Sequence, residues 1–289
     1  MSYQYRFLSR ELFPRVHQTF REAFADYYVD TSGVTESILY NRAVKNGVDF
    51  DVSVGAFDGE KMVAVTIVGR DEWKGGPAAY DIGTGVIPGH RGQGLAGGMF
   101  DFALPRLRER GVKRFVLEVI QDNEPAIKVY EAAGFRITRE FDCFKWSLDT
   151  VVSRDLPGSP LEIRTAPRKL LDEISRHVDW RPSWENSFNS LLRIPDHLDV
   201  YGAYDAGELA GLLVYYPALN WINTLVVKRE CRRRGVATAL LVHFAHERPG
   251  NKTVVKFVNV DHTDRATLSL LEKTGFELHV RQYEMELEL

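Results

Sequence analysis

The sequence lacks several features that would point to particular classes of protein. It has two cysteines among 289 residues, Cys143 and Cys231, and their wide spacing resembles neither a metal site nor a disulfide framework. No apolar run reaches the roughly 18 residues of a membrane span, and the first residues carry no signal-peptide core. We therefore expect two reduced, unpaired thiols, no metal, no membrane and a cytoplasmic location.

A strong excess of charge of one sign is also missing. The chain has 37 basic and 40 acidic residues, a formal net charge of -3, and a division at residue 150 leaves both halves close to neutral. This balance argues against a general nucleic-acid or membrane binder. What is present is 44% hydrophobic residues, enough to bury the core of one large or two medium domains.

A glycine-rich turn stands out between two regular segments. The alternating run Tyr80–Val86 predicts a strand, and an apolar-periodic run to Arg110 predicts a helix. The turn between them runs Ile87-Pro88-Gly89-His90-Arg91-Gly92-Gln93-Gly94-Leu95-Ala96. Unbonded amides at the start of a helix, together with its dipole, attract a phosphate. The alternative is that the glycines only shape a turn and a cap.

The rest of the first half predicts a mixed α/β pattern. The expected elements are a strand at 5–8, helices at 10–27 and 35–48, a hairpin at 50–68, a loop at 71–77, a strand at 114–120, a helix at 123–133 and a pair of strands at 135–148. A Ser, Asp, Gly and Pro-rich stretch follows. We therefore divide the chain into a domain at 1–149, a linker at 150–160 and a domain at 161–289.

The second half repeats the first. Arg232–Ala237 repeats the pattern of Arg91–Ala96, and 40 positions separate Gly94 from Gly134 just as 40 separate Gly235 from Gly275. Chance would not keep this spacing. The sequence therefore contains an internal duplication.

Two motifs in the first copy resemble the signatures of the GCN5-related N-acetyltransferase (GNAT) family. They are Arg91-x-x-Gly94-x-Ala96 after a strand, and Asn123-x-x-Ala126 leading to Tyr130-Glu131-x-x-Gly134-Phe135. The resemblance implies two tandem GNAT-like α/β domains, each with a mixed sheet that splays to admit acetyl-CoA. It also implies these coenzyme contacts in the first domain: Val86, Ile87, Arg91, Gly92, Gln93, Gly94, Leu95, Ala96, Gly97 and Asn123.

The chemistry of acetyl transfer suggests roles for three side chains. An ordinary amine is almost fully protonated at pH 7, so a base or a desolvating site is needed, and a departing thiolate benefits from an acid. Tyr130 holds the position that the resemblance gives to the acid; the alternative is a core tyrosine. Glu118 is the candidate base, because it lies in an apolar strand and precedes Tyr130 by 12 positions, as in bacterial acetyltransferases of ribosomal-protein N-termini. Asp81 is the reserve, and Glu118 could instead be satisfied structurally.

The second copy differs at these positions. Leu271 replaces Tyr130, Asn259 replaces Glu118 and Asp264 replaces Asn123. Cations surround its loop at Lys228, Arg229 and Arg232–Arg234. Either an anion binds them or solvent and Glu230 screen them, and we favour screening. A degenerate coenzyme site or a nucleic-acid contact stays open.

These observations predict an N-acetyltransferase whose first domain moves acetyl from acetyl-CoA directly to a primary amine, with a second domain that is structural or shapes the substrate cleft. The acceptor would be a small molecule or a peptide, with no nucleic acid and no membrane involved, in a monomer that mimics a dimer or in a homodimer. Loop residues Asp26, Tyr27, Tyr28, Asp30 and Glu36 could face that amine. One alternative is a non-catalytic acyl-CoA-binding regulator, and another is catalysis in the second domain.

Overall fold

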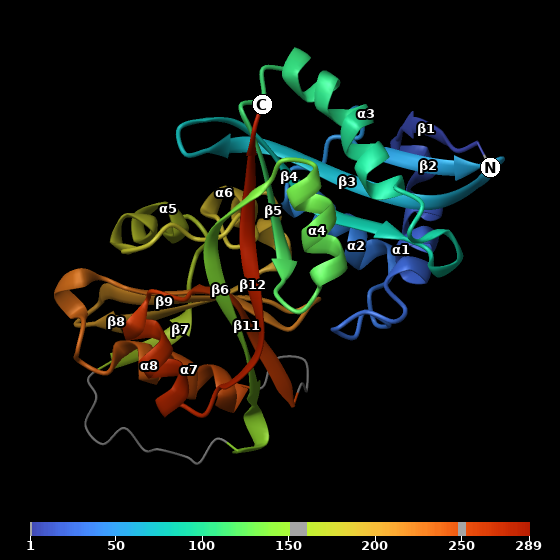
Figure 1. The fold of residues 1–289 in the computed structure, drawn as a ribbon. Coiled ribbons are helices and arrows are strands. Elements are labelled where there is room, and N and C mark those ends of the chain that lie inside the picture. The colour runs from blue at the N-terminus through green and yellow to red at the C-terminus, as the bar shows by residue number, and fades with distance from the viewer. Residues whose placement is uncertain (1, 151–160, 248–252) are drawn as a thin grey trace. The chain divides into compact units, whose positions relative to one another are not determined.

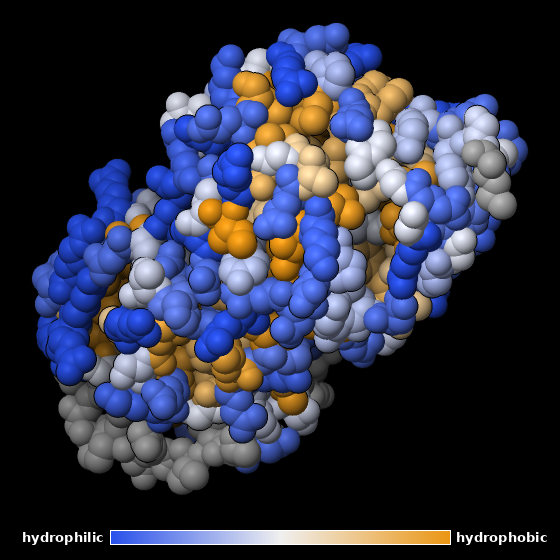
Figure 2. Space-filling view, viewed as in Figure 1, coloured by the Kyte–Doolittle hydropathy of each residue, from blue (hydrophilic) through white to orange (hydrophobic). Residues whose placement is uncertain are grey.

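The computed structural model describes residues 2–150, 161–247 and 253–289. The chain forms two compact units, one of Met1–Arg139 with Gln282–Leu289 and the other of Glu140–Arg281. Apart from Thr150, the linker expected at 150–160 lies outside the described residues. No helix within the described ranges is long and apolar enough to cross a membrane. The face seen in Figure 2 is largely hydrophilic, with hydrophobic side chains in separate groups.

The first unit follows the expected order of elements closely. Its elements are β1 (Gln4–Phe7), α1 (Phe13–Ala23), α2 (Glu36–Lys45), β2 (Val54–Asp58), β3 (Lys61–Trp73), β4 (Gly76–Val86), α3 (Leu95–Glu109), β5 (Arg114–Ile120), α4 (Glu124–Ala132) and the end of β12 (Glu277–Glu288). Capping side chains mark where helices begin. Thr35 Oγ1 accepts a hydrogen bond from Ile38 N at the start of α2, as an N-cap does.

The sheet of the first unit opens in its middle. Its strand order is β1-β2-β3-β4-β5-β12, and β4 with β5 is the parallel pair. That pair is in register only from Ala78–Arg114 to Asp81–Leu117, whereas β4 stays paired with β3 as far as Val86. Beyond Asp81 the two strands diverge (Figure 1), which is the splay that the resemblance implies.

Helices cover both faces of this sheet. On one face, Phe100 of α3 packs against Phe115 of β5 and against Tyr130 of α4. On the other face, α1 lies so close to β4 that a Cβ at Gly85 would come within 2.8 Å of Ala23. Figure 1 shows α3 and α4 on the side of the sheet opposite to α1 and α2. The glycine therefore sets the close approach of α1 to the splayed strand.

Two expectations about strands are wrong. The loop expected at 71–77 is mostly strand, because β3 and β4 join through a tight turn in which Lys74 and Gly75 both have positive φ. The pair of strands expected at 135–148 is one strand, β6 (Arg136–Ser147). No residue within that run has positive φ or breaks the extended backbone, so it continues through both alternating stretches.

The second unit repeats the same plan. Its elements are the end of β6, β7 (Leu161–Thr165), α5 (Leu170–Ile174), α6 (Phe188–Leu192), β8 (Asp199–Asp205), β9 (Glu208–Tyr216), β10 (Trp221–Val227), α7 (Val236–Glu247), β11 (Val254–Asp261) and α8 (Arg265–Lys273). The strand order is β6-β11-β10-β9-β8-β7, with β10 and β11 parallel.

The last strand of each repeat belongs to the other unit. Phe141–Ser147 of β6 pair with β11 in the second unit, and Gln282–Glu288 of β12 pair with β5 in the first. The compact units therefore differ from the two contiguous halves of the sequence by this exchange. Met285 of β12 is fully buried and packs in the core of the first unit.

Candidate active site

The glycine-rich turn leaves open space before the N-terminus of α3. Gly92 and Gly94 have φ of 73° and 75°, a left-handed conformation that favours glycine. A Cβ on Gly92, Gly94 or Gly97 would meet nothing within 4 Å. The first bond within the helix runs from Gly98 N to Gly94 O at 2.9 Å, so the amides of the first helical residues have no helical acceptor. The turn therefore fits a phosphate.

Arg91 anchors this turn through its side chain. Its guanidinium donates to both carboxylate oxygens of Asp26 at 2.7 Å, to Ala23 O at 2.9 Å and to Val86 O at 3.2 Å. The hydrogen bond from Arg91 holds the pKa of Asp26 below its usual value. Both Arg91 and Asp26, which the sequence suggested for coenzyme and amine, are thus engaged with each other.

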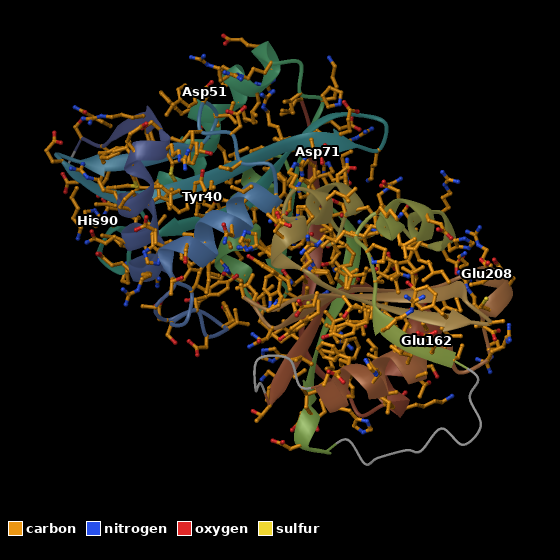
Figure 3. The ribbon with its side chains drawn as sticks, turned by 180° about the vertical axis from the view of Figure 1, so that it is seen from behind. Tyr40, Asp51, Asp71, His90, Glu162 and Glu208 are labelled. Carbon is orange, nitrogen blue, oxygen red and sulfur yellow. The ribbon has the colours of Figure 1, made fainter. Side chains whose placement is uncertain are left out.

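The N-terminal segment also contacts the turn. Tyr3 Oη donates to Gln93 Oε1 at 2.7 Å and lies 2.9 Å from Nδ1 of His90, which Figure 3 labels. The Gln93 side chain, expected at the coenzyme, is therefore bonded to Tyr3.

Val86, the last residue of β4, and Ile87, which follows it, present their amides to opposite sides. Ile87 N donates to Val63 O of β3 at 3.0 Å. Because neighbouring residues of a strand direct their N–H groups to alternate edges, Val86 N–H points away from β3 and toward the splay. Of the two predicted backbone donors, Val86 is the one on the open edge, while Ile87 is used within the sheet.

Tyr130 lies on α4 beside the splay with its ring in the core. It is 8% exposed and packs against Phe100 and Phe135, with ring centroids 5.8 and 6.0 Å away. Burial raises the pKa of Tyr130 well above its usual value, and the nearby charges of Asp81 and Tyr27 raise it further. The phenol is therefore protonated at neutral pH and able to donate a proton.

Asp81 lies on the same face as Tyr130, where β4 and β5 part. Its Oδ2 accepts from Thr84 Oγ1 at 2.8 Å, and its buried Oδ1 makes no hydrogen bond with any described residue. Burial raises the pKa of Asp81 to about 7, against the opposing effects of hydrogen bonds from Thr84 and Gly83 and of the charge of Arg42. The sequence analysis did not single out Thr84. A hydroxyl in an apolar strand needs a hydrogen-bond partner, and this could have pointed to it.

Glu118 occupies the opposite face. Its neighbour Leu117 is the register partner of Asp81 and packs in the core with Tyr130. Successive residues of a strand point to opposite faces, so the half-buried Glu118 points to the face covered by α1 and α2. The structure thus brings Tyr130 and Asp81 together and places Glu118 across the sheet from them.

Asn123 has a capping role in the structure. Its Oδ1 accepts from Ala126 N at 3.3 Å at the start of α4. It also bonds to Tyr27, which offsets part of the rise that burial causes in the pKa of the Tyr27 phenol. Tyr28 Oη donates to Asp122 O at 2.9 Å. The segment after α1, suggested to face an amine, therefore lies against the turn before α4.

The second unit keeps the loop but has leucine in place of the tyrosine. Arg232 repeats the anchor of Arg91, donating to Asp179 and to His177 O. Leu271, in the position of Tyr130, is fully buried. The cations around this loop are largely paired with Glu173, Asp179 and Asp205, as the following ion pairs show: Lys228–Glu173, Arg229–Asp179, Arg232–Asp179 and Arg234–Asp205. Glu230 lies 3.9 Å from His177, and its charge also contributes to the raised pKa of Lys228, after the larger effect of the hydrogen bond from Lys228 to Glu173.

Comparison with known proteins identifies the fold and family. The sequence profile of the acetyltransferase (GNAT) family matches residues 13–135 and again 165–276. The chain belongs to this family. The match confirms the duplication and the tandem GNAT arrangement, in a family of acyltransferases that use acetyl-CoA as co-substrate. Among the described residues, no three His, Cys, Asp or Glu side chains gather as metal ligands.

Similar proteins carry acetyltransferase names. Mycothiol acetyltransferase of Corynebacterium aurimucosum is 41% identical over 56 residues, 19% of this chain and 18% of that protein. N-alpha-acetyltransferase 30 of Schizosaccharomyces pombe is 28% identical over 123 residues, 42% of this chain and 81% of that protein. Streptothricin acetyltransferase of Streptomyces lavendulae is 38% identical over 84 residues, 29% of this chain and 42% of that protein.

Solved structures show the same GNAT fold over the full chain. A tandem GNAT protein from the clavulanic acid biosynthesis pathway has a TM-score of 0.76 at 16% identity and covers 99% of this chain and 98% of its own. A GCN5-related N-acetyltransferase from Sphaerobacter thermophilus has a TM-score of 0.72 at 18% identity, with coverage of 99% and 95%.

Proposed function

We propose that the first unit transfers an acetyl group from acetyl-CoA to the amine of a small molecule or a peptide. The observation that carries this proposal is the buried, protonated Tyr130 beside the point where β4 and β5 diverge. A proton donor there can assist the departure of a thiolate. The second unit has Leu271 in the same position, and its side chain cannot donate a proton.

The residues of the first unit fit the coenzyme. The open turn at Gly92–Gly97, with helix amides that lack helical acceptors, would hold the diphosphate. Val86 N–H, on the open edge of β4, would donate to the thioester carbonyl oxygen. When bound, acetyl-CoA supplies an acetyl group activated as a thioester.

Glu118 and Tyr130 would divide the proton transfers between the two faces of the sheet. Tyr130 would give its proton to the sulfur, and Glu118, on the face of α1 and α2, would take a proton from the amine, directly or through water. Asp81 is the competing base, because its pKa of about 7 allows it to take up a proton near neutral pH. A conservative variant of each carboxylate separates these two assignments.

The substitution Tyr130→Phe tests the proposed acid. It keeps the packed ring and removes the phenol, so we expect kcat to fall about 10²- to 10⁴-fold, with acetyl-CoA binding nearly unchanged. Steady-state kinetics and calorimetric titration measure the two effects. Tyr40→Phe, on α2, is the matched control. Turnover by Tyr130→Phe that equals wild type across the pH range would reject the assignment.

The base is tested by the pH dependence of kcat/KM. If Glu118 is the base, Glu118→Gln removes most activity while Asp81→Asn keeps the wild-type profile. The opposite result assigns the role to Asp81. A panel of small-molecule and peptide amines, followed by release of coenzyme A, defines the acceptor. Coenzyme binding with no release across the panel would favour an acyl-CoA-binding regulator over an enzyme.

A further inference from the structure

A cavity lies at one end of the β7–β8 pair in the second unit. Its volume is about 580 Å³, within the range of small-molecule sites, and its lining consists of residues 165–169 and 198–201. The chain leaves β7 for α5 through the first segment and enters β8 through the second, and Ala166 N donates to Val200 O at 2.8 Å between them. None of the lining residues belongs to the loop before α7 or to the diverging strands β10 and β11.

The first repeat has buried valines where this cavity has polar side chains. When β8 is aligned with β2 through their shared Gly-Ala-aromatic-Asp sequence, Asp199 takes the position of Val52. Tyr201 takes the position of Val54. Both valines are 0% exposed and pack in the core of the first unit. A carboxylate in place of a core valine is costly unless another group compensates its charge.

No such group reaches Asp199 within the described part of the chain. Its side chain is half-buried and makes no hydrogen bond or ion pair with any described residue. Burial raises the pKa of the Asp199 carboxyl, and the charge of Arg168 offsets part of this rise. The Arg168 guanidinium donates instead to Asp196 at 2.6 Å, and Asp196 does not line the cavity. Asp199 therefore offers its carboxylate to a cation from outside the protein.

The cavity also carries a cation that is not engaged. Lys169 is exposed, and its ammonium group makes no hydrogen bond or ion pair with any described residue. Lys169 and Asp199 line the same cavity without pairing with each other, so their charged groups are more than about 4 Å apart. A ligand that itself carries an ammonium and a carboxylate can bond to both.

The remaining lining is apolar or aromatic. Ala166, Leu198 and Val200 are 5%, 4% and 3% exposed. Burial raises the pKa of Tyr201 to about 12, with a further contribution from the charge of Asp199, so the phenol keeps its proton. A neutral aromatic ring near a carboxylate suits an ammonium group, and the apolar side chains suit a hydrophobic one.

We propose that this cavity binds a free amino acid with a hydrophobic side chain. Asp199 accepts hydrogen bonds from the ammonium group of the amino acid, Lys169 binds its carboxylate, and the apolar lining contacts its side chain. This role goes beyond the acetyl transfer proposed for the first unit. It does not depend on that transfer, because none of the lining residues belongs to the candidate active site.

Binding is measured on the full chain with L-leucine and L-phenylalanine as probes. Calorimetric titration gives the affinity, and hydrogen exchange followed by mass spectrometry locates the site. We expect saturable binding at millimolar or lower concentrations, together with severalfold slower exchange in peptides that cover residues 165–170 and 198–204. Slower exchange in these peptides distinguishes the cavity from an acceptor site in the first unit.

Two analogues test the two charges of the ligand without altering the protein. N-acetyl-L-leucine has no ammonium group, and L-leucinamide has no carboxylate. Each loses one charge-assisted contact, so each should bind about tenfold more weakly than L-leucine, or weaker still.

Variants test the two side chains. Asp199→Asn keeps the shape of the side chain, Lys169→Met keeps its aliphatic stem, and each should weaken L-leucine binding about tenfold or more. Asp172→Asn is the matched control and should keep the wild-type affinity, because it removes an exposed carboxylate of α5 that does not line the cavity. Circular dichroism confirms that each variant is folded.

Two results would overturn the proposal. One is unchanged exchange at residues 165–170 and 198–204 with both amino acids at millimolar concentrations. The other is equal affinity for L-leucine and L-leucinamide, which would mean a simple amine site. Both results are separate from turnover, because Tyr130→Phe should abolish most acetyl transfer and leave amino acid binding at this cavity intact.

Discussion

At the scale of single residues, two buried carboxylates of the first unit differ in the groups that surround them. Glu284 is fully buried and accepts hydrogen bonds from Arg139 Nε at 2.9 Å and Nη2 at 2.6 Å, and from Thr138 Oγ1 at 3.0 Å. Asp81 Oδ2 accepts from the Thr84 hydroxyl, and its buried Oδ1 makes no hydrogen bond with any described residue; burial raises the pKa of Asp81 more than the hydrogen bonds from Thr84 and Gly83 lower it. Glu284 thus faces a guanidinium at hydrogen-bond distance, whereas burial without such a contact raises the pKa of Asp81 to about 7.

Asp81 should make stability depend on pH. Its pKa is about 7 in the folded chain and near 4 when unfolded, so the folded state binds more protons between these values. The free energy of unfolding should therefore fall as pH rises from about 4 to 7, by up to roughly 4 kcal/mol. Urea unfolding of wild type and Asp81→Asn at pH 5 and pH 8 isolates the contribution of Asp81 to the free energy of unfolding. Equal differences between the two proteins at both pH values would contradict it.

Removing only one partner of the Arg139–Glu284 pair should be costly. Arg139→Met leaves an uncompensated buried charge, and we expect a loss of about 3–5 kcal/mol in the free energy of unfolding. The double variant Arg139→Met with Glu284→Met should recover much of that loss, since no buried charge remains. Urea denaturation of the single and double variants measures both effects. A double variant that is less stable than the single one would refute this account.

For single residues, the sequence predicts which positions have a special role better than it predicts which residues they contact. Motif spacing located Tyr130 and the glycine turn, because a backbone that needs positive φ at Gly92 and Gly94 restricts the amino acid. It did not show that Arg91 would bind Asp26, which is 65 positions away. Nor did it show which of Val86 and Ile87 faces the splay, since that depends on the register with β3.

Among the elements, the pair of diverging strands differs most between the two units. In the first unit, β4 leaves β5 after Asp81, and the helix that approaches β4 needs Gly85 to do so. In the second unit, the segment between α5 and α6 supplies Asn186 to bridge β10 and β11. In the second unit, a side-chain bridge thus joins the two strands that diverge. The sequence showed which residues of these strands differ between the two copies. It gave no sign that the Asn186 side chain would reach the strands.

Asn186→Ala should destabilise the second unit. It leaves the Val258 carbonyl and the Asn223 amide buried without their partners, at an expected cost of about 1–3 kcal/mol. Thermal and urea unfolding measure the loss, and hydrogen exchange at the end of β11 should rise with it. Asn189→Ala, in α6, is a nearby control. If the end of β11 exchanged at the wild-type rate in Asn186→Ala, the bridge would not hold these strands.

On the scale of the whole molecule, the exchange of the last strands joins two units that the sequence treats as separate. The repeated 40-residue spacing predicted two copies of one fold, and the family match confirms it. It could not predict that β12 pairs with β5, because the pairing of segments far apart in the sequence leaves no local pattern. The pairing depends on tertiary contacts such as Arg139–Glu284.

A chain that ends at Leu148 should not form a stable first unit. It exposes the edge of β5 and loses Met285, which is buried in the core with Leu117. We expect aggregation, or unfolding without a cooperative transition, in calorimetry and circular dichroism. Cooperative unfolding of this fragment at the wild-type temperature, with unchanged transferase activity, would contradict the prediction.

The strand exchange also bears on synthesis of the chain at the ribosome. Domains usually fold in the order in which they are translated, the N-terminal one first. Here the first sheet needs Gln282–Leu289, which are made after the whole second repeat. Until then β5 presents an unpaired edge, so the unit that we propose to be catalytic would be the last to be completed and the one most exposed to premature termination.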